Sequence, residues 1–256
     1  MIASDSRMPL ITIVTATLNC EASIRRTGDS LAEQANDSFE WIVVDGESKD
    51  STLDVLGDFR GIIGRVLRGR DEGIYDAWNK AVEAARGEWI GFLGAGDTYE
   101  RTALNDYTSV ICEREASGRG NIDYISSRVR LTDGTRDLRI LGAPWDWKRF
   151  CRWMCVAHVG SLHNRRLFAG GRRFDKRYRI CGDYEFLLRF GSSLRAEFLD
   201  GITASMMTGG VSSTIVEACR EAERAKVSTR AQGALAARTQ RIWATGSGLV
   251  RSVVWY

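Results

Sequence analysis

The sequence predicts an α/β protein in which helices flank a mixed, mainly parallel central sheet. Hydrophobic, β-branched runs alternate with amphipathic segments, a pattern typical of parallel sheets. Several of these runs are apolar throughout, as in strands that are buried on both faces. The 256 residues suit one large domain or two small ones. The predicted strands in the first half are residues 10–16, 40–44, 62–67 and 88–93.

Helical segments separate these strands along the chain. Residues 21–35 are predicted to be helical, and Asp50 is predicted to cap a helix that Gly57 ends. Residues 74–86 have the spacing of an amphipathic helix, with Gly87 as the predicted C-cap. The apolar stripe of that helix consists of Ile74, Ala77, Trp78, Ala81 and Ala85.

The second half of the chain has a less regular pattern. Residues 132–134 form a predicted turn between strands, and residues 144–154, rich in Trp and Arg, give no assignment. The predicted elements are helices at 101–116 and 183–190, strands within 122–141 and 197–207, and an Ala- and Arg-rich helical tail from 217 to about 243.

Composition excludes several classes of function. The hydrophobic content of 44% and charged content of 27% are ordinary for a soluble globular protein, and the net charge of +3 is too small to indicate nucleic-acid binding. Apolar stretches fall short of the ~18–20 residues that cross a bilayer, and the first residues lack the pattern of a signal peptide. The six cysteines are scattered, so we expect reduced thiols and a cytoplasmic protein.

A carboxylate stands just past the end of two of the predicted strands, Asp45 directly after residues 40–44 and Asp97 after the short segment 94–96. Asp45 and Asp97 are therefore expected at the carboxyl edge of the sheet, where open α/β sheets bind ligands. Gly94 and Gly96 leave the backbone before Asp97 bare, so that a pyrophosphate and a hard cation can approach. Such cations prefer oxygen ligands, and Asp97 is the predicted ligand for Mg²⁺ or Mn²⁺. The alternatives are a turn aspartate at 45 and a plain strand-to-loop turn at 97.

Polar residues also leave the first strand. Thr15, Thr17 and Asn19 can present hydroxyl, amide and backbone groups to a ligand at the same edge. Simple helix capping is the alternative for these residues.

The segment from Asp71 to Lys80 opens the amphipathic helix. Asp71 and Gly73 precede its first turn, where acidic residues are ordinary partners of the helix dipole. Asn79 and Lys80 supply donors that suit a nucleotide-contacting face, and a solvated face is the alternative.

Asp183 begins another predicted helix and is a candidate general base. An N-cap is the alternative role for a residue of this type at that place. His158 is one of two histidines, and such a histidine is more often structural than catalytic.

Taken in order, these segments resemble glycosyltransferase family 2, the inverting nucleotide-sugar enzymes of GT-A fold. The resemblance covers residues 9–212. Residues 14–19 stand where the family has "IPTYN", and residues 43–52 look like its "VVDDGSTDGT". Residues 94–97 look like the metal-binding "DxD" segment with its first aspartate missing and the last carboxylate kept. Residues 182–185 resemble the segment that carries the catalytic base.

The exopolysaccharide or colanic-acid branch of that family is the nearest in motif. Residues 71–81 are similar to its "DxGIYDAMNKG", and His158 matches a histidine that begins the segment before the base. Gly209, Gly210 and Ser212 match its closing "GGxS", which we expect to form a loop at the diphosphate.

The resemblance implies transfer of a sugar from a nucleotide-diphosphate donor to an acceptor hydroxyl, with inversion. Asp183 would be the base and Asp97 would hold the cation, while His158 and the 209–212 segment would serve the acceptor or the closing loop. We expect residues 1–105 to be the donor-binding half of one GT-A domain, 106–216 the acceptor-binding half, and 217–256 a helical extension. The expected donor-binding residues are Thr15, Thr17, Asn19, Asp45, Asp71, Gly73, Asn79, Lys80 and Gly96.

The basic segments of the chain and the family resemblance together indicate its binding partners. Seven basic residues between 165 and 179, and a basic tail that ends in Trp255 and Tyr256, suit a lipid pyrophosphate or an anionic membrane surface. A solvated face, or packing on the domain or on a second subunit, is the alternative. The expected acceptor is therefore a saccharide, lipid-linked in the simplest case, at the inner face of the cytoplasmic membrane, with a homodimer also open.

Other functions compete with this interpretation. A non-catalytic nucleotide-sugar-binding or scaffold subunit stays open because one aspartate of the metal segment is missing. A nucleotidyltransferase would want a glycine-rich loop with Arg and Lys after the first strand, and residues 15–21 have none. A dinucleotide oxidoreductase would need a GxGxxG motif at that place.

Overall fold

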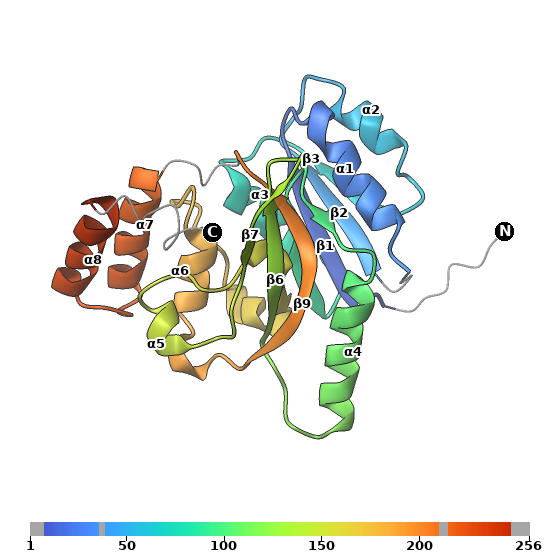
Figure 1. The fold of residues 1–256 in the computed structure, drawn as a ribbon. Helices are drawn as coiled ribbons and strands as arrows, with labels where there is room; N and C mark the ends of the chain where they lie inside the picture. Colours follow the sequence, from blue (N-terminus) through green and yellow to red (C-terminus); the bar gives the residue numbers. More distant parts are fainter. Residues whose placement is uncertain (1–7, 36–38, 210–214, 247–256) are drawn as a thin grey trace.

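The computed structural model describes residues 8–35, 39–209 and 215–246 (Figure 1). Within these residues nine strands form one mixed sheet, in the order β3-β2-β1-β4-β8-β6-β9-β5, with β7 paired to β6. The strands are β1 Ile11–Thr17, β2 Phe39–Asp45, β3 Ile63–Arg68, β4 Trp89–Phe92, β5 Thr98–Tyr99, β6 Tyr124–Thr132, β7 Asp137–Leu141, β8 Ser161–Asn164 and β9 Ala196–Met207. The helices are α1 Glu21–Ala32, α2 Thr52–Gly57, α3 Ile74–Ala84, α4 Ala103–Ala116, α5 Trp147–Phe150, α6 Gly182–Leu188, α7 Ile215–Ser228 and α8 Ala234–Gly246, with short 3₁₀ turns at His158–Gly160, Arg165–Gly171 and Gly191–Ser193.

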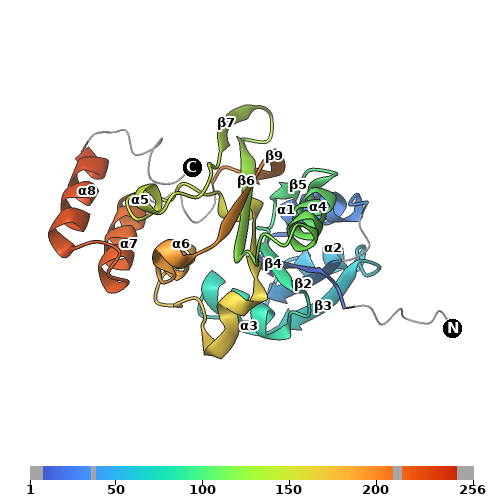
Figure 2. The ribbon, with the colours of Figure 1, turned by 90° about the horizontal axis from the view of Figure 1, so that it is seen from below.

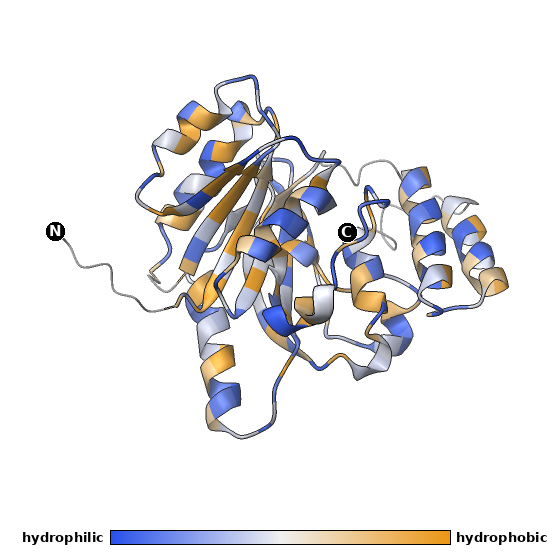
Figure 3. Cartoon of the chain, turned by 180° about the vertical axis from the view of Figure 1, so that it is seen from behind, coloured by the Kyte–Doolittle hydropathy of each residue, from blue (hydrophilic) through white to orange (hydrophobic). Residues whose placement is uncertain are grey.

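The first half of the sheet is parallel, which confirms the predicted α/β class. β3, β2, β1 and β4 all run in one direction, and helices connect them. Alternate side chains of β1 and β2 feed two apolar clusters, one on each face of the sheet. Figure 1 shows α1 and α2 over one face, and Figure 2 shows α3 on the other. The strands are mostly hydrophobic and the helices mixed (Figure 3).

The second half mixes directions. β8 is antiparallel to both β4 and β6, whereas β6 and β9 are parallel to each other. β8 has no sequence prediction, because Ser161-Leu162-His163-Asn164 carries neither an apolar run nor an alternation. All four residues are nevertheless buried, since β8 lies between two neighbours in the centre of the sheet. The sheet thus continues across the predicted boundary at residue 105.

Several local predictions need correction. Ser51, not Asp50, precedes the first turn of α2. Gly87 is not a C-cap, since α3 ends at Ala84. A Cβ at Gly87 would lie 2.6 Å from the Thr12 backbone nitrogen, so this glycine permits close approach of the chain to β1. The segment 144–154 contains the short helix α5, and β9 is one strand of 12 residues.

The C-terminal tail forms a pair of helices. α7 packs against α6, and α8 packs against α7 (Figures 1 and 2). In the described part of the chain, each helix is too short or too polar to cross a membrane. Leu235, Ile242 and Trp243 of α8 are exposed large hydrophobic residues.

Candidate active site

Three residues form a row at the carboxyl edge of the parallel strands. Thr17 ends β1, Asp45 ends β2 and Arg68 ends β3, and the strand register places them side by side. The Thr17 hydroxyl donates to Asp45 Oδ1 at 3.2 Å, and the Ser48 backbone N–H donates to Asp45 Oδ2 at 3.1 Å. Arg68 Nε lies 3.6 Å from Oδ2. Although Asp45 is fully buried, its carboxylate therefore has a cation and two donors around it.

Arg68 was absent from the sequence prediction. The expected strand at 62–67 ended one residue before it, and an arginine after a weak strand carries no signal by itself. The strand register places Arg68 in the site. It pairs with Asp45 in a parallel ladder and therefore lies at the same carboxyl edge of the sheet.

Asn19 fastens the two loops beside this row. It has a left-handed backbone (φ 49°), its N–H donates to Ser48 Oγ at 2.9 Å, and its Oδ1 accepts from the Lys49 N–H at 2.8 Å. The loop that follows β1 is thus bonded to the loop that follows β2.

The first turn of α3 connects this edge with the predicted base. Asp71 Oδ1 accepts from the Gly73 N–H at 3.0 Å, and Asp71 Oδ2 would lie 2.8 Å from a Cβ at Gly46. Glycine at 46 therefore leaves room for Asp71 next to Asp45. Tyr75 follows in the same turn and reaches Asp183.

Three predicted donor-binding residues have their polar groups used within the fold. The Thr15 hydroxyl accepts from Trp41 Nε1 at 3.0 Å inside the sheet. The Asn79 side chain pairs with the N–H and the carbonyl of Phe174, both at 2.9 Å, and so ties α3 to the second half of the chain. Lys80 Nζ donates to the Arg70 carbonyl at 2.7 Å and supports the loop that carries Asp71. In this structure the side chains of Thr15 and Asn79 are buried and hydrogen-bonded to other parts of the fold.

Asp97 lies in a tight loop after β4. Its Oδ1 accepts from the Met207 N–H at 2.9 Å, which links this loop to the end of β9. Burial raises the pKa of Asp97 to about 6. The Thr27 hydroxyl donates to the Asp97 carbonyl and accepts from the Gly96 N–H, both at 2.8 Å, and Gly96 has a positive φ of 103°.

These contacts set what kind of cation site is possible. Among the described residues no group of three His, Cys, Asp or Glu side chains could hold a metal ion. Asp97 is thus a single carboxylate, and a cation there would take its other ligands from a diphosphate and water, as Mg²⁺ does in many phosphate sites. A Cβ at Gly94 would lie 2.6 Å from Asp97 Oδ2, so glycine at 94 makes room for that oxygen.

Asp183 is a buried carboxyl in the first turn of α6. Tyr75 Oη lies 3.1 Å from Asp183 Oδ1 and 2.7 Å from the Ile180 carbonyl, to both of which it can donate. Burial raises the pKa of Asp183 to about 6, although the Tyr75 hydrogen bond lowers it. Cys181 precedes the helix, so Asp183 is not its N-cap.

His158 adjoins this carboxyl. Its Nδ1 lies 3.7 Å from Asp183 Oδ2, and its ring stacks on Trp78 and Phe92 with centroids 4.9 and 5.3 Å apart. Burial lowers the pKa of His158 to about 3, so the imidazole is neutral at pH 7. Gly209 ends the described segment with a φ of 93°, and Gly210 and Ser212 lie outside the described residues.

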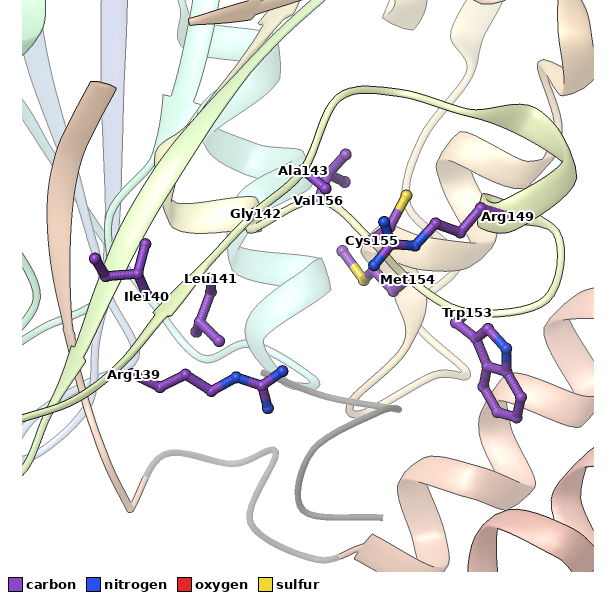
Figure 4. A pocket seen from close by; sticks show the side chains of 10 residues that line it. All are labelled: Arg139, Ile140, Leu141, Gly142, Ala143, Arg149, Trp153, Met154, Cys155 and Val156. Carbon is purple, nitrogen blue, oxygen red and sulfur yellow. The ribbon is translucent and has the colours of Figure 1, made fainter. Parts of the chain in front are cut away.

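A hollow lies between β7 and the segment before His158 (Figure 4). It has a volume of about 320 Å³, and Figure 4 shows Arg139 and Arg149 reaching toward each other across it, with Trp153 at its rim. Val156, two residues before His158, lines its wall. The other lining residues are Ile140, Leu141, Gly142, Ala143, Met154 and Cys155.

Comparison with known proteins identifies the family of this chain. Residues 12–142 match the family described as "Glycosyl transferase family 2", and the chain belongs to that family. A "PGL/p-HBAD biosynthesis glycosyltransferase" of Mycobacterium bovis is 33% identical over 218 residues, which cover 82% of this chain and 81% of that protein.

Solved structures match the fold over almost the whole chain. S. aureus TarS 1-349 in complex with UDP-GlcNAc has a TM-score of 0.69 at 17% identity, over 94% of this chain and 76% of that one. The mannosyltransferase PcManGT from Pyrobaculum calidifontis, in complex with GDP-Man and Mn²⁺, has a TM-score of 0.66 at 14% identity, over 96% and 76%. The GT-A fold expected from the resemblance is thereby confirmed.

Proposed function

We propose that the protein moves a sugar, with inversion, from a nucleotide-diphosphate donor to a hydroxyl of a saccharide acceptor in cell-envelope glycan synthesis. Membership of glycosyltransferase family 2 supports transfer of this kind. The observation that carries the mechanism is Asp183, a buried carboxyl that Tyr75 holds and whose pKa is about 6. A base poised just below neutral pH is ionised when the acceptor arrives and can still hold a proton.

The chemical step needs one base and no covalent intermediate. Tyr75 occupies Asp183 Oδ1, so Oδ2 is the atom proposed to take the acceptor's proton. The acceptor oxygen forms a bond to the anomeric carbon while the bond from that carbon to the diphosphate breaks. Attack opposite the leaving group inverts the anomeric centre. Neutral His158 beside Oδ2 does not compete for the proton, because its pKa is about 3.

The donor nucleoside is assigned to the strand edge. Asp45, fixed by Thr17 and Arg68, would accept from the base or a ribose hydroxyl, with the loop at Asn19 beside it. Asp71 lies next to Asp45 through Gly46. Gly73, Lys80 and Gly96 complete the proposed donor set, Lys80 by supporting the loop before Gly73.

A divalent cation, Mg²⁺ or Mn²⁺, is proposed at Asp97. When bound, it would neutralise charge on the leaving diphosphate. Asp97 would hold it with one carboxylate oxygen while Oδ1 stays bonded to the Met207 N–H. The Mn²⁺ that accompanies GDP-Man in the PcManGT structure supports the use of a divalent cation, and its placement at Asp97 is part of this proposal.

The acceptor is assigned to the hollow between β7 and residues 154–156. Two arginines there suit an anionic group such as the phosphate of a lipid-linked saccharide. The exposed apolar residues of α8 fit contact with a membrane surface or a second copy of the chain. We accordingly propose a cytoplasmic enzyme that works at the inner face of the membrane.

Calorimetric titration with UDP, GDP and dTDP, each with and without Mn²⁺, tests the function. We expect one nucleotide to bind tightly and to need the metal. A folded protein that binds none of them would overturn the proposal. Metal-independent binding without turnover would favour a scaffold subunit, which the lack of a three-ligand metal group in the described residues keeps as the second candidate.

A further inference from the structure

Glu221, in the C-terminal helix α7, contacts the segment directly before the proposed base. Its Oε2 accepts from the backbone N–H groups of Ile180 and Cys181, each at 2.9 Å, and its Oε1 accepts from that of Arg179 at 2.9 Å. One carboxylate thus receives three consecutive amides that end two residues before Asp183. Hydrogen bonds to a charged acceptor are stronger than those to a neutral one.

The same segment is fastened to α7 at other points. Cys181 Sγ donates to the Ala218 carbonyl at 3.3 Å, one turn before Glu221. One turn after it, Arg224 stacks over the Tyr178 ring at 4.2 Å. Three successive turns of α7 therefore contact residues 178–181.

Ile180 is gripped from two sides. Glu221 accepts from its N–H, while the Tyr75 hydroxyl of α3 lies 2.7 Å from its carbonyl and 3.1 Å from Asp183 Oδ1, so that these two acceptors share its single proton. Because the chain enters α6 at this residue, the two contacts fix the orientation of the first turn of α6. That turn carries Asp183.

We propose that Glu221 is a positioning residue for the base Asp183, so that α7 belongs to the catalytic centre. The sequence alone presents this helix as part of a basic extension that follows the catalytic domain. The inference rests on the proposed function, in which Asp183 is the base.

Electrostatics give the contact a separate signature. The titratable groups that face Asp183 are Tyr75, His158, Cys181 and Glu221. Burial raises the pKa of the Tyr75 hydroxyl and the Cys181 thiol well above their ordinary values, and His158 is neutral. Burial is the main cause of the raised pKa of Asp183, hydrogen bonds from Tyr184, Tyr75 and its own backbone lower it, and the negative charge of Glu221 adds a smaller upward contribution. Removing that charge should lower the pKa of Asp183.

The test compares Glu221→Gln, Glu221→Ala and the control Glu223→Gln in the full chain. Glu223 lies on the same helix and pairs with Arg241 of α8, so it makes the same charge change at a residue that is bonded to α8. We expect Glu221→Ala to lower kcat by about 10- to 100-fold with little change in donor KM, because misplacing a reacting group by about 1 Å can cost ~10² in rate. Glu221→Gln should shift the acid limb of the kcat profile to lower pH, and Glu223→Gln should change neither.

Hydrogen exchange supplies a readout that needs no turnover. Amides 179–181 should exchange faster in Glu221→Ala than in Glu223→Gln. Unchanged exchange, or a normal kcat with an unshifted acid limb, would overturn the positioning role. If the wild-type protein transferred no sugar to any acceptor, the proposed function would fail. Faster exchange in Glu221→Ala would then show only that Glu221 stabilises the structure of residues 179–181.

Discussion

The proposed donor edge and the proposed base centre of this protein are built in different ways. At the donor edge, Thr17, Asp45 and Arg68 come from three adjacent parallel strands, and the ladder register alone lines them up. At the base centre, Asp183 depends on Tyr75 from α3, His158 from a 3₁₀ turn and, through the preceding segment, Glu221 from α7. A site made by register should tolerate change in distant helices, whereas a site made by convergent contacts should not.

The largest effect is expected from Asp183→Asn. Loss of the base should lower kcat by about 10²–10⁴-fold while donor affinity stays the same. Steady-state kinetics measure the loss of kcat, and nucleotide calorimetry measures whether donor affinity is unchanged. A variant that turned over at the normal rate would show that Asp183 is not the base.

The same variant should be more stable at neutral pH. The folded pKa of Asp183 lies at about 6, above its ordinary value of 3.8, so ionising it in the folded protein is unfavourable and stability falls as pH rises through about 6. About two pKa units correspond to about 3 kcal/mol, which Asn should recover at pH 7.5 and not below pH 4. Urea unfolding of both proteins at the two pH values measures the difference, and an equal gain at both would contradict the buried-ionisation account.

Asp45→Asn breaks the other region. Since Asp45 accepts from Thr17 and Ser48 and faces Arg68, the loss of its charge should weaken nucleotide binding by about 10- to 100-fold, as for ~1.5–3 kcal/mol of charged hydrogen bonding. The acid limb of the kcat profile should not move. A shifted limb with unchanged affinity would mean that the two regions are coupled.

Tyr75→Phe tests the link between the regions with a smaller effect. The phenol donates to Asp183 and lowers its pKa, so its loss should move the acid limb to higher pH, opposite in direction to Glu221→Gln. The lost hydrogen bond should cost about 0.5–1.5 kcal/mol of stability. A pH series of kcat measures the direction, with Tyr107→Phe as control because its buried phenol bonds Ser127 and Thr203; movement to lower pH would exclude this role for Tyr75.

The smallest effect is expected from protonation of Asp97, the proposed cation ligand. Protonation through its pKa of about 6 should weaken Mn²⁺-dependent nucleotide binding below that pH. In Asp97→Asn the dependence on pH and on Mn²⁺ should disappear together. If Mn²⁺ still strengthened nucleotide binding to that variant, the cation would have to be held elsewhere.

Residue pattern was enough to predict much of the proposed donor-binding half. Apolar runs followed by Asp45 and Asp97 predicted parallel strands and their carboxyl edge, because an apolar run reports burial on both faces and a helix between two strands brings them back in the same direction. The motif from Asp71 to Lys80 was also recognisable in the sequence. Several of its residues make contacts inside the protein, where the sequence pattern had indicated contacts with a ligand. Asp71 fits against Gly46, Tyr75 reaches Asp183, and Asn79 ties α3 to Phe174.

The remaining features depend on long-range packing, which residue pattern does not report. β8 is a central strand without a strand pattern, because its burial comes from neighbours on both sides rather than from its own residues. Arg68 joins the site through ladder register, and Glu221 joins it across 38 residues of chain to Asp183, a contact that no periodicity encodes. The local sequence pattern indicates which side chains of a strand or helix are buried. The residues that those side chains contact are set by long-range packing.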